Sequence, residues 1–290
     1  MSAASSAGRG QGLPNVSVGS ISQNSSPGTV SVHGMRWLAT QFSRYEVGGG
    51  RRDDIRERPH HLISDPRTEG LLRDLEREYL GAVDLGFLGP HEGVRLRERH
   101  LEDALGLAAL RTPAVDERWV DMGSGAGLPG LPLATAFRDT SFTLVDAHRR
   151  RLDWVAATAA RLGIENVRVV HARLEEYGRG VGREQFDVAT ARALGALPVV
   201  AELGAPLLKI GGSLMVPRGQ PSDDELRRLA AVGEMVGLEI RDVIHNPSSR
   251  IDPVGFVVIM AKIAATSPRF PRRSGVPARS PLGGQRPTET

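Results

Sequence analysis

The sequence contains no cysteine and no long apolar run. Without cysteine the chain can form no disulfide, no thiolate nucleophile and no cysteine–zinc site. The lack of any run of about 18 apolar residues argues against a transmembrane helix. Residues 1–32 are rich in Ser and Gly and lack the apolar stretch of a secretory signal. We therefore expect a cytoplasmic protein that makes no contact with a membrane.

Lysine and aromatic residues are also scarce. Lys209 and Lys262 are the only lysines among 37 basic residues, and aromatic residues make up 4% of the chain. The net charge is only +3, yet the sequence pI is about 9.8. Arginine presents a planar fork of donors that suits phosphates and the edges of bases. For the bulk count, however, a general preference for arginine codons is the favoured explanation. The histidines form no cluster in the sequence, so we expect no metal.

Composition and hydrophobic spacing divide the 290 residues into four segments. The first segment, residues 1–66, has too little hydrophobicity to offset the entropy lost on ordering the chain. The second carries leucines at helical spacing. The fourth segment, residues 266–290, interleaves arginine with proline and is expected to be extended, not packed. The segments are a disordered or weakly ordered N-terminal extension (1–66), a helical subdomain (67–112), a core (113–265) and a basic Pro/Arg-rich tail (266–290).

Within the core, short apolar strands alternate with helices. The predicted strands are 119–122, 141–146, 167–171, 186–190, 213–216, 238–244 and 254–263, and the predicted helices are 150–162, 197–208 and 223–235. Strands separated by helices imply parallel pairing with right-handed crossovers. The short connection between the last two strands allows an antiparallel pair at the sheet edge. The predicted fold is a doubly wound, Rossmann-like α/β sheet of the class I methyltransferase type, mostly parallel with an antiparallel last strand, preceded by the small helical subdomain.

The sharpest local signal is a glycine-rich loop, D-M-G-S-G-A-G-L-P-G, at residues 121–130. It follows an apolar strand and precedes a run compatible with a helix. Glycines allow a tight turn and a close approach of the backbone to a ligand. The loop also fits the G-x-G-x-x-G pattern of dinucleotide enzymes, which is weak evidence by itself. A glycine turn without any ligand is the plainest alternative.

Two carboxylates favour S-adenosylmethionine as the ligand of this loop. Asp121 ends the first strand, where it would attract the ammonium group of that cofactor and repel a pyrophosphate. Asp146 ends the second strand and is placed to accept hydrogen bonds from ribose hydroxyls, which both cofactors carry. The loop therefore supplies a set of cofactor-binding candidates. These candidates are Asp121, Gly123, Ser124, Gly125 and Leu128, together with Asp146.

Several segments together resemble the RsmG (GidB) family of ribosomal RNA small-subunit methyltransferases. The similar segments are R-H-L-E-D at 99–103, the loop with its two downstream prolines at 121–132, R-L-E-E at 173–176, F-D-V-A-T-A-R-A at 186–193 and P-R-F-P-R-R-S-G-V-P at 268–277. The resemblance covers roughly residues 70–282 in the order that the family shows. One departure is Arg218, which stands in Pro217–Gly219 where the family usually has lysine before glycine.

The resemblance implies a role for each matching position. Gly123 and Leu128 contact the cofactor, Leu174 and Glu175 lie beside its adenine, and Arg192 faces the site of methyl transfer. The implied reaction places a methyl on N7 of a guanine in 16S ribosomal RNA. N7 carries a free lone pair, so the reaction needs no general base.

The remaining expectations concern the substrate. Arg192 and Arg218 are the candidate catalytic residues, and Arg192 is a candidate for binding the cofactor as well. His100 and Asp103 are candidates for lining the pocket. The tail either binds RNA phosphates or is merely solvated. We expect a monomer that acts on 16S ribosomal RNA or the small ribosomal subunit. The alternatives are a methyltransferase of the same fold acting on another RNA or a small molecule, a non-catalytic RNA-binding protein, and a nucleotide-dependent oxidoreductase.

Overall fold

The computed structural model describes residues 65–246 and 255–284. The predicted disorder of the N-terminal extension therefore falls almost entirely outside the described residues. The first described helix, α3, begins at Pro66, and the side chain of Asp65 accepts hydrogen bonds from its first turn. No helix in these two ranges is long and apolar enough to cross a membrane.

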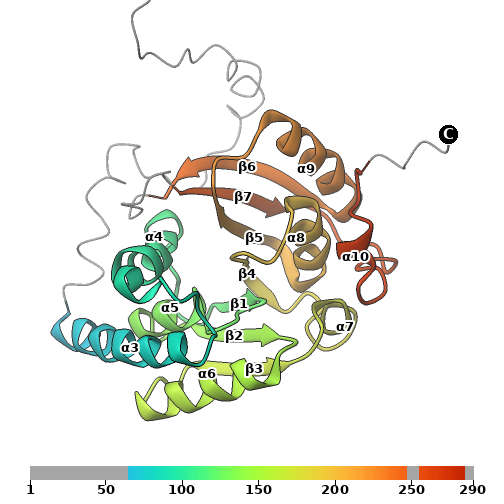
Figure 1. Cartoon of the computed structure of the whole chain (residues 1–290). Coiled ribbons are helices and arrows are strands. Elements are labelled where there is room, and N and C mark those ends of the chain that lie inside the picture. The colour runs from blue at the N-terminus through green and yellow to red at the C-terminus, as the bar shows by residue number, and fades with distance from the viewer. Residues whose placement is uncertain (1–64, 247–254, 285–290) are drawn as a thin grey trace, which may run out of the picture. The chain divides into compact units, whose positions relative to one another are not determined.

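A seven-stranded sheet forms the centre of the fold, in the order β3-β2-β1-β4-β5-β7-β6. The strands are β1 (Arg118–Met122), β2 (Ser141–Asp146), β3 (Val167–His171), β4 (Phe186–Thr190), β5 (Leu208–Arg218), β6 (Leu238–His245) and β7 (Phe256–Lys262). Strands β1 to β5 pair in parallel, whereas β7 runs antiparallel between β5 and β6. The predicted class I methyltransferase topology, with its antiparallel last strand, is confirmed (Figure 1).

Helices lie against both faces of this sheet (Figure 1). The helices are α3 (Pro66–Asp84), η3 (Gly93–Arg95), η4 (Leu96–Glu102), α4 (Asp103–Leu110), α5 (Gly130–Ala136), α6 (Arg149–Arg161), α7 (Leu174–Arg179), α8 (Leu197–Gly204), η5 (Ala205–Leu207), α9 (Asp223–Val236) and α10 (Val276–Arg279). Alternate residues of each strand enter opposite cores: Trp119 packs with the helices before β2, and Val120 packs with α8. This alternation places Asp121 on the same face as the N-terminal helices.

Short polar signals in the sequence explain several helix boundaries. Helix α9 begins with a capping box, because Ser222 accepts from the Glu225 amide while the Glu225 carboxylate accepts from the Ser222 amide. It ends at Gly237, which has a φ of +80°. Helix α3 buries Leu72, Leu75 and Tyr79, which is the apolar stripe expected from its spacing.

Three local predictions were wrong. The helix expected over 197–208 ends earlier, and Leu208 is already the first residue of β5. The glycine pair Gly211 and Gly212 is typical of a helix end and predicts one here, but both residues lie inside β5, where Gly211 has a φ of +88°. The entry helix before the core is 3₁₀, then π, then α in character. Helix α7 was not predicted, because six residues provide too short a period to recognise.

The tail was expected to be extended, and this expectation is also wrong. Phe270, Pro271 and Pro277 are buried, and residues 276–279 form α10. The physical reason is a strong ion pair: the guanidinium of Arg272 makes two hydrogen bonds, of 2.7 and 2.8 Å, to the carboxylate of Glu202 in α8. The tail therefore packs against α7 and α8 as part of the fold.

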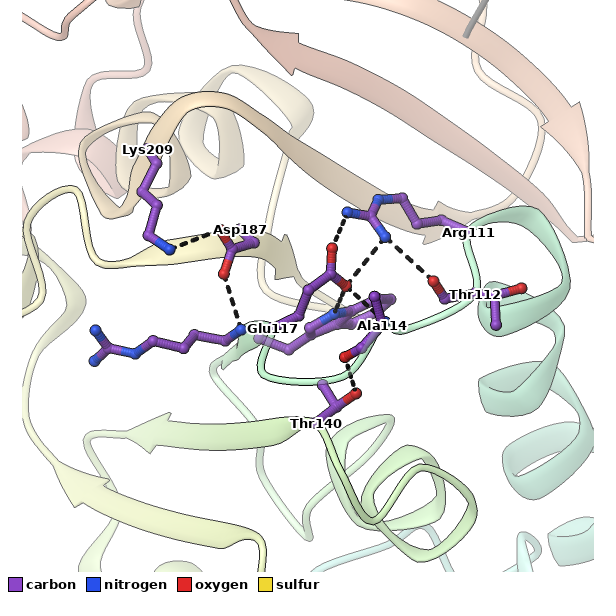
Figure 2. Close-up of polar contacts among 9 residues, drawn as sticks. Arg111, Thr112, Ala114, Glu117, Thr140, Asp187 and Lys209 are labelled. Carbon is purple, nitrogen blue, oxygen red and sulfur yellow. Dashed lines mark hydrogen bonds and ion pairs between the residues drawn. The ribbon is translucent and has the colours of Figure 1, made fainter. Parts of the chain in front are cut away.

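Carboxylates fix the N-terminal ends of the central strands (Figure 2). Glu117 accepts hydrogen bonds from the Ala114 amide, from the Trp119 indole and from Arg111. Asp187 accepts from the Arg118 amide at 2.9 Å and from Lys209 at 2.7 Å. These contacts set the positions of β1, β4 and β5 at the end opposite the glycine loop.

Candidate functional site

The glycine loop joins the C-terminal end of β1 to α5, as predicted. Gly123, Gly125 and Gly127 have φ values of +66°, +54° and +82°, a region that other residues avoid. The amides of Gly123 and Ser124 donate to the Val145 carbonyl at 2.8 and 3.2 Å. The loop is therefore held against the end of β2, where Asp146 lies.

The two predicted acids both bind the backbone of this loop. One Asp121 oxygen accepts from the Gly130 amide at 2.9 Å, and one Asp146 oxygen accepts from the Gly125 amide at 2.8 Å. The other Asp146 oxygen accepts from the amide and the Nδ1 of His148. The carboxylates lie close enough for Asp146 to raise the pKa of Asp121. The structure therefore places both acids at one loop.

The two acids differ in protonation. Burial raises the pKa of Asp121 from 3.8 to about 7, and hydrogen bonding from Gly130 and the charge of Arg192 reduce that rise. Burial also acts to raise the pKa of Asp146, but hydrogen bonds from His148 and Gly125 outweigh it and lower that pKa. Asp121 therefore has a strongly destabilised negative charge, which a cationic ligand would relieve.

The helical subdomain reaches the same site. Tyr79 of α3 donates to the Gly127 carbonyl at 3.4 Å. Burial and the nearby charge of Asp121 raise the pKa of Tyr79, and the charge of Arg192 acts in the opposite direction. Arg192, which follows β4, forms a hydrogen bond with His100 of η4, and His100 forms a second hydrogen bond with Glu92. Burial lowers the pKa of Arg192, and the charge of Asp103, which was predicted to line the pocket, acts in the opposite direction. Neither Tyr79 nor Glu92 was predicted. A tyrosine among leucines at helical spacing resembles an ordinary core residue.

Several buried polar atoms at this end of the sheet have no hydrogen-bond partner among the described residues. They include Asp121 Oδ1, Ser124 Oγ, Thr190 Oγ1 and Arg192 Nη1. Thr190 lies directly beside Asp121 in the pairing of β4 with β1. Buried polar groups are normally satisfied, so such a group of atoms is typical of a site for a polar ligand. The free oxygen of Asp121 suits the ammonium group of S-adenosylmethionine. The hydroxyls of Ser124 and Thr190 suit its carboxylate.

The remaining predicted residues lie elsewhere or are already engaged. The Glu175 carboxylate accepts from the Gly275 amide at 2.7 Å, and Leu174 beside it is packed in the core. Leu128, within the loop itself, is buried. Arg218 ends β5 and pairs with Glu225 of α9 at 2.7 Å. The contacts that the structure gives for Arg218 do not join it to Arg192 or Asp121. In residues 65–246 and 255–284 no group of His, Asp and Glu forms a candidate metal site.

Comparison with known proteins decides the family. The sequence profile of GidB, "rRNA small subunit methyltransferase G", matches residues 81–246, more than half of the chain. The chain belongs to the GidB family. It is thus an S-adenosylmethionine-dependent methyltransferase, as predicted.

Several curated proteins resemble this GidB protein, each called ribosomal RNA small subunit methyltransferase G. The protein of Chloroflexus aggregans is 40% identical over 63% of this chain and 77% of its own length. Those of Ligilactobacillus salivarius and Synechococcus elongatus are 33% and 37% identical, and the matches cover 78% of each. Among solved structures, a SAM dependent methyltransferase from Aquifex aeolicus is 15% identical with a TM-score of 0.44, over 58% of this chain and 93% of that one.

Gly125 provides a test of where the cofactor lies in this GidB protein. A Cβ at Gly125 would meet no other atom within 4 Å, and the same is true of Gly163 after α6. Both have positive φ, so Gly125→Ala and Gly163→Ala should each lose about 1–2 kcal/mol of stability. Only Gly125→Ala should also weaken S-adenosylmethionine binding, by about ten- to hundredfold, because its methyl fills space that the cofactor needs.

Titration calorimetry and urea unfolding measure the two effects separately. Gly163→Ala is the matched control, because it has the same backbone strain without the loop. Wild-type cofactor affinity in both variants would show that the open space over Gly125 is not used for binding.

Proposed function

We propose that the protein transfers a methyl group from S-adenosylmethionine to N7 of a guanine in the 16S ribosomal RNA of the small subunit. The observation that supports this most is the position of Arg192. It lies beside a glycine loop with a buried carboxylate, it retains an unpartnered buried nitrogen, and the chain belongs to a family of rRNA small subunit methyltransferases. Arginine is the side chain that most often reads guanine.

The polar groups at the site suit a reaction that needs no general base. His100, the histidine bonded to Arg192, has both ring nitrogens engaged, and burial lowers its pKa to about 4. N7 of guanine carries its lone pair in the intact base, so no proton has to be removed before attack. S-adenosylmethionine supplies an already activated methyl group when it is bound. The protein's task is then to align the base and hold it close, which contributes up to about 7–11 kcal/mol in favourable cases.

Each candidate residue has a distinct part in this proposal. Asp121 binds the ammonium group of the cofactor, and Asp146 binds its ribose. Leu174 and Glu175 lie beside the adenine. Arg192 Nη1 binds the guanine acceptor O6 while N7 attacks. Arg218, whose side chain is partly exposed beside Glu225, binds an RNA phosphate.

The RNA partner would be held mainly through arginine. Arg149 and Arg150 are exposed at the start of α6, and Arg173 is exposed just before α7. In the packed tail, Arg269 and Arg273 are exposed as well. Contacts of this kind between arginine and phosphate supply affinity without sequence preference. We further propose that the protein acts as a monomer in the cytoplasm, where its RNA substrate is.

Mass spectrometry of nucleosides from 16S ribosomal RNA tests the proposal. A strain without the gene should lack one 7-methylguanosine, and the wild-type gene should restore it. If the modification persists in the deletion strain, the substrate is different. Purified protein then separates the alternatives: S-adenosylmethionine binding without methylation of 16S RNA favours another substrate, whereas no binding favours a non-catalytic RNA-binding protein.

A further inference from the structure

A buried histidine connects Arg192 to a carboxylate of the helical subdomain. His100 is 4% exposed and lies in η4, a π-helix, a form that is rare and often occurs at functional sites. Its Nδ1 lies 2.5 Å from Arg192 Nη2, and its Nε2 lies 2.9 Å from Glu92 Oε2. The three side chains therefore form a continuous hydrogen-bonded series from Arg192, two residues after β4, to Glu92 in the turn before η3.

These contacts are compatible with only one form of the imidazole. Arginine can only donate, so Nδ1 must accept and carries no hydrogen. Nε2 then carries the hydrogen and donates to the Glu92 carboxylate. Burial and the positive charges of Arg192 and Arg99 lower the pKa of His100 to about 4, although Glu92 acts in the opposite direction. The ring is therefore neutral at physiological pH.

The histidine occupies one nitrogen of the guanidinium and leaves another available. Arg192 Nη1 is buried and has no partner among the described residues. A carboxylate in place of His100 would bind the guanidinium through two parallel hydrogen bonds and neutralise it. The neutral ring fixes its orientation and leaves its charge intact. Asp121 lies within electrostatic range of Arg192, but the guanidinium forms its hydrogen bond with His100.

We propose that His100 is a positioning residue for methyl transfer, which holds Arg192 Nη2 so that Nη1 stays available to the target base. This inference rests on the proposed function, because the base acceptor is taken to be guanine O6. Glu92 in turn fixes the tautomer and the ring orientation of His100, as outer carboxylates do for functional histidines elsewhere. The helical subdomain then contributes to catalysis by orienting a residue of the core.

Asparagine and glutamine separate the two nitrogens of His100. The amide oxygen of His100→Asn can replace Nδ1 as the acceptor for Arg192. The amide nitrogen of His100→Gln can replace Nε2 as the donor to Glu92, but this variant has no acceptor for Arg192 at the position of Nδ1. With small ribosomal subunits from the deletion strain and saturating S-adenosylmethionine, His100→Gln and His100→Ala should lower kcat about ten- to hundredfold. His100→Asn should stay close to wild type.

Cofactor binding and folding are measured on the same variants. S-adenosylmethionine affinity should be unchanged in all three, because the contact acts on the base and not on the cofactor. The exposed neighbour His91 supplies the control, and His91→Asn and His91→Gln should match wild type. Equal kcat values for His100→Asn and His100→Gln would overturn the proposal, because a merely structural role does not distinguish them. If His100→Ala does not fold, the comparison of kcat between His100→Asn and His100→Gln still tests the proposal.

Nitrogen-15 NMR gives a readout that is independent of RNA. Near neutral pH, His100 in wild-type protein should be protonated at Nε2 and unprotonated at Nδ1, with its signal assigned from its loss in His100→Gln. The opposite tautomer or a charged ring would overturn the inference. Wild-type protein that leaves 16S RNA unmethylated would overturn the proposed function instead, and the tautomer would still decide whether His100 holds Arg192.

Discussion

Replacing Arg272 with alanine should lower the free energy of unfolding by about 3–5 kcal/mol. Its partner Glu202 is 0% exposed, and both carboxylate oxygens accept from the Arg272 guanidinium. One of them also accepts from the Arg272 amide at 2.9 Å. Removing the guanidinium leaves a buried negative charge without its counterion, which is among the most destabilising changes in a protein interior.

The neighbouring arginine is the matched control for this prediction. Arg273 is exposed, so Arg273→Ala should change stability by no more than about 0.5 kcal/mol. Urea unfolding followed by circular dichroism gives both values, and the midpoint should fall only for Arg272→Ala. Similar midpoints for the two variants would show that the tail does not depend on the ion pair.

S-adenosylmethionine affinity should fall as the pH decreases below about 7, and Asp121→Asn should remove that dependence. The pKa of Asp121 is about 7 in the unliganded protein, mainly because the carboxyl group is buried. In the proposed role of Asp121 the cofactor ammonium group binds the charged carboxylate, so below pH 7 a proton must first leave. Affinity should therefore drop about tenfold for each unit of pH below 7 and level off above it.

The same shift affects the stability of the unliganded protein in the opposite direction. Since the folded pKa of Asp121 is raised above 3.8, its contribution to stability is greatest at low pH and is lost as the pH rises towards 7. Bound cofactor should offset this loss at high pH. Asp121→Asn should bind the cofactor about a hundredfold or more weakly than wild type at pH 8, because the buried ion pair is missing.

Calorimetric titrations over a range of pH measure these affinities. Thr190→Ser is a useful control at the same depth, because it leaves the neighbouring carboxylate and a hydroxyl in place. An affinity for wild type that does not vary with pH would show that Asp121 is not the partner of the ammonium group.

Much of the fold could be predicted because its signals are local. The bounds of β2, β3 and β4 were predicted correctly, since each is a short apolar run next to a turn. The capping box of α9 and the glycine turn after β1 also depend on residues close together in the sequence. The acids Asp121 and Asp146 could be paired, because parallel neighbouring strands end at the same edge of a sheet.

What could not be predicted depends on contacts between distant residues. Glu202 and Arg272 are 70 residues apart, and neither has a local feature that marks it for an ion pair. Tyr79 and Glu92 reach the site only through the packing of the helical subdomain on the sheet. The π-helical turns of η4 contain no proline or glycine to mark them. The cofactor roles of the loop residues remain predictions that binding measurements can test.

The long separation between Glu202 and Arg272 also has a consequence for biosynthesis. During translation α8 is made first, and its acid has no counterion until the polypeptide has grown by a further 70 positions. In an incomplete nascent polypeptide the Glu202 carboxylate of α8 therefore lacks the arginine that neutralises it in the finished fold. Premature termination before Arg272 should yield molecules that quality-control proteases recognise, even though every strand of the sheet has already been synthesised.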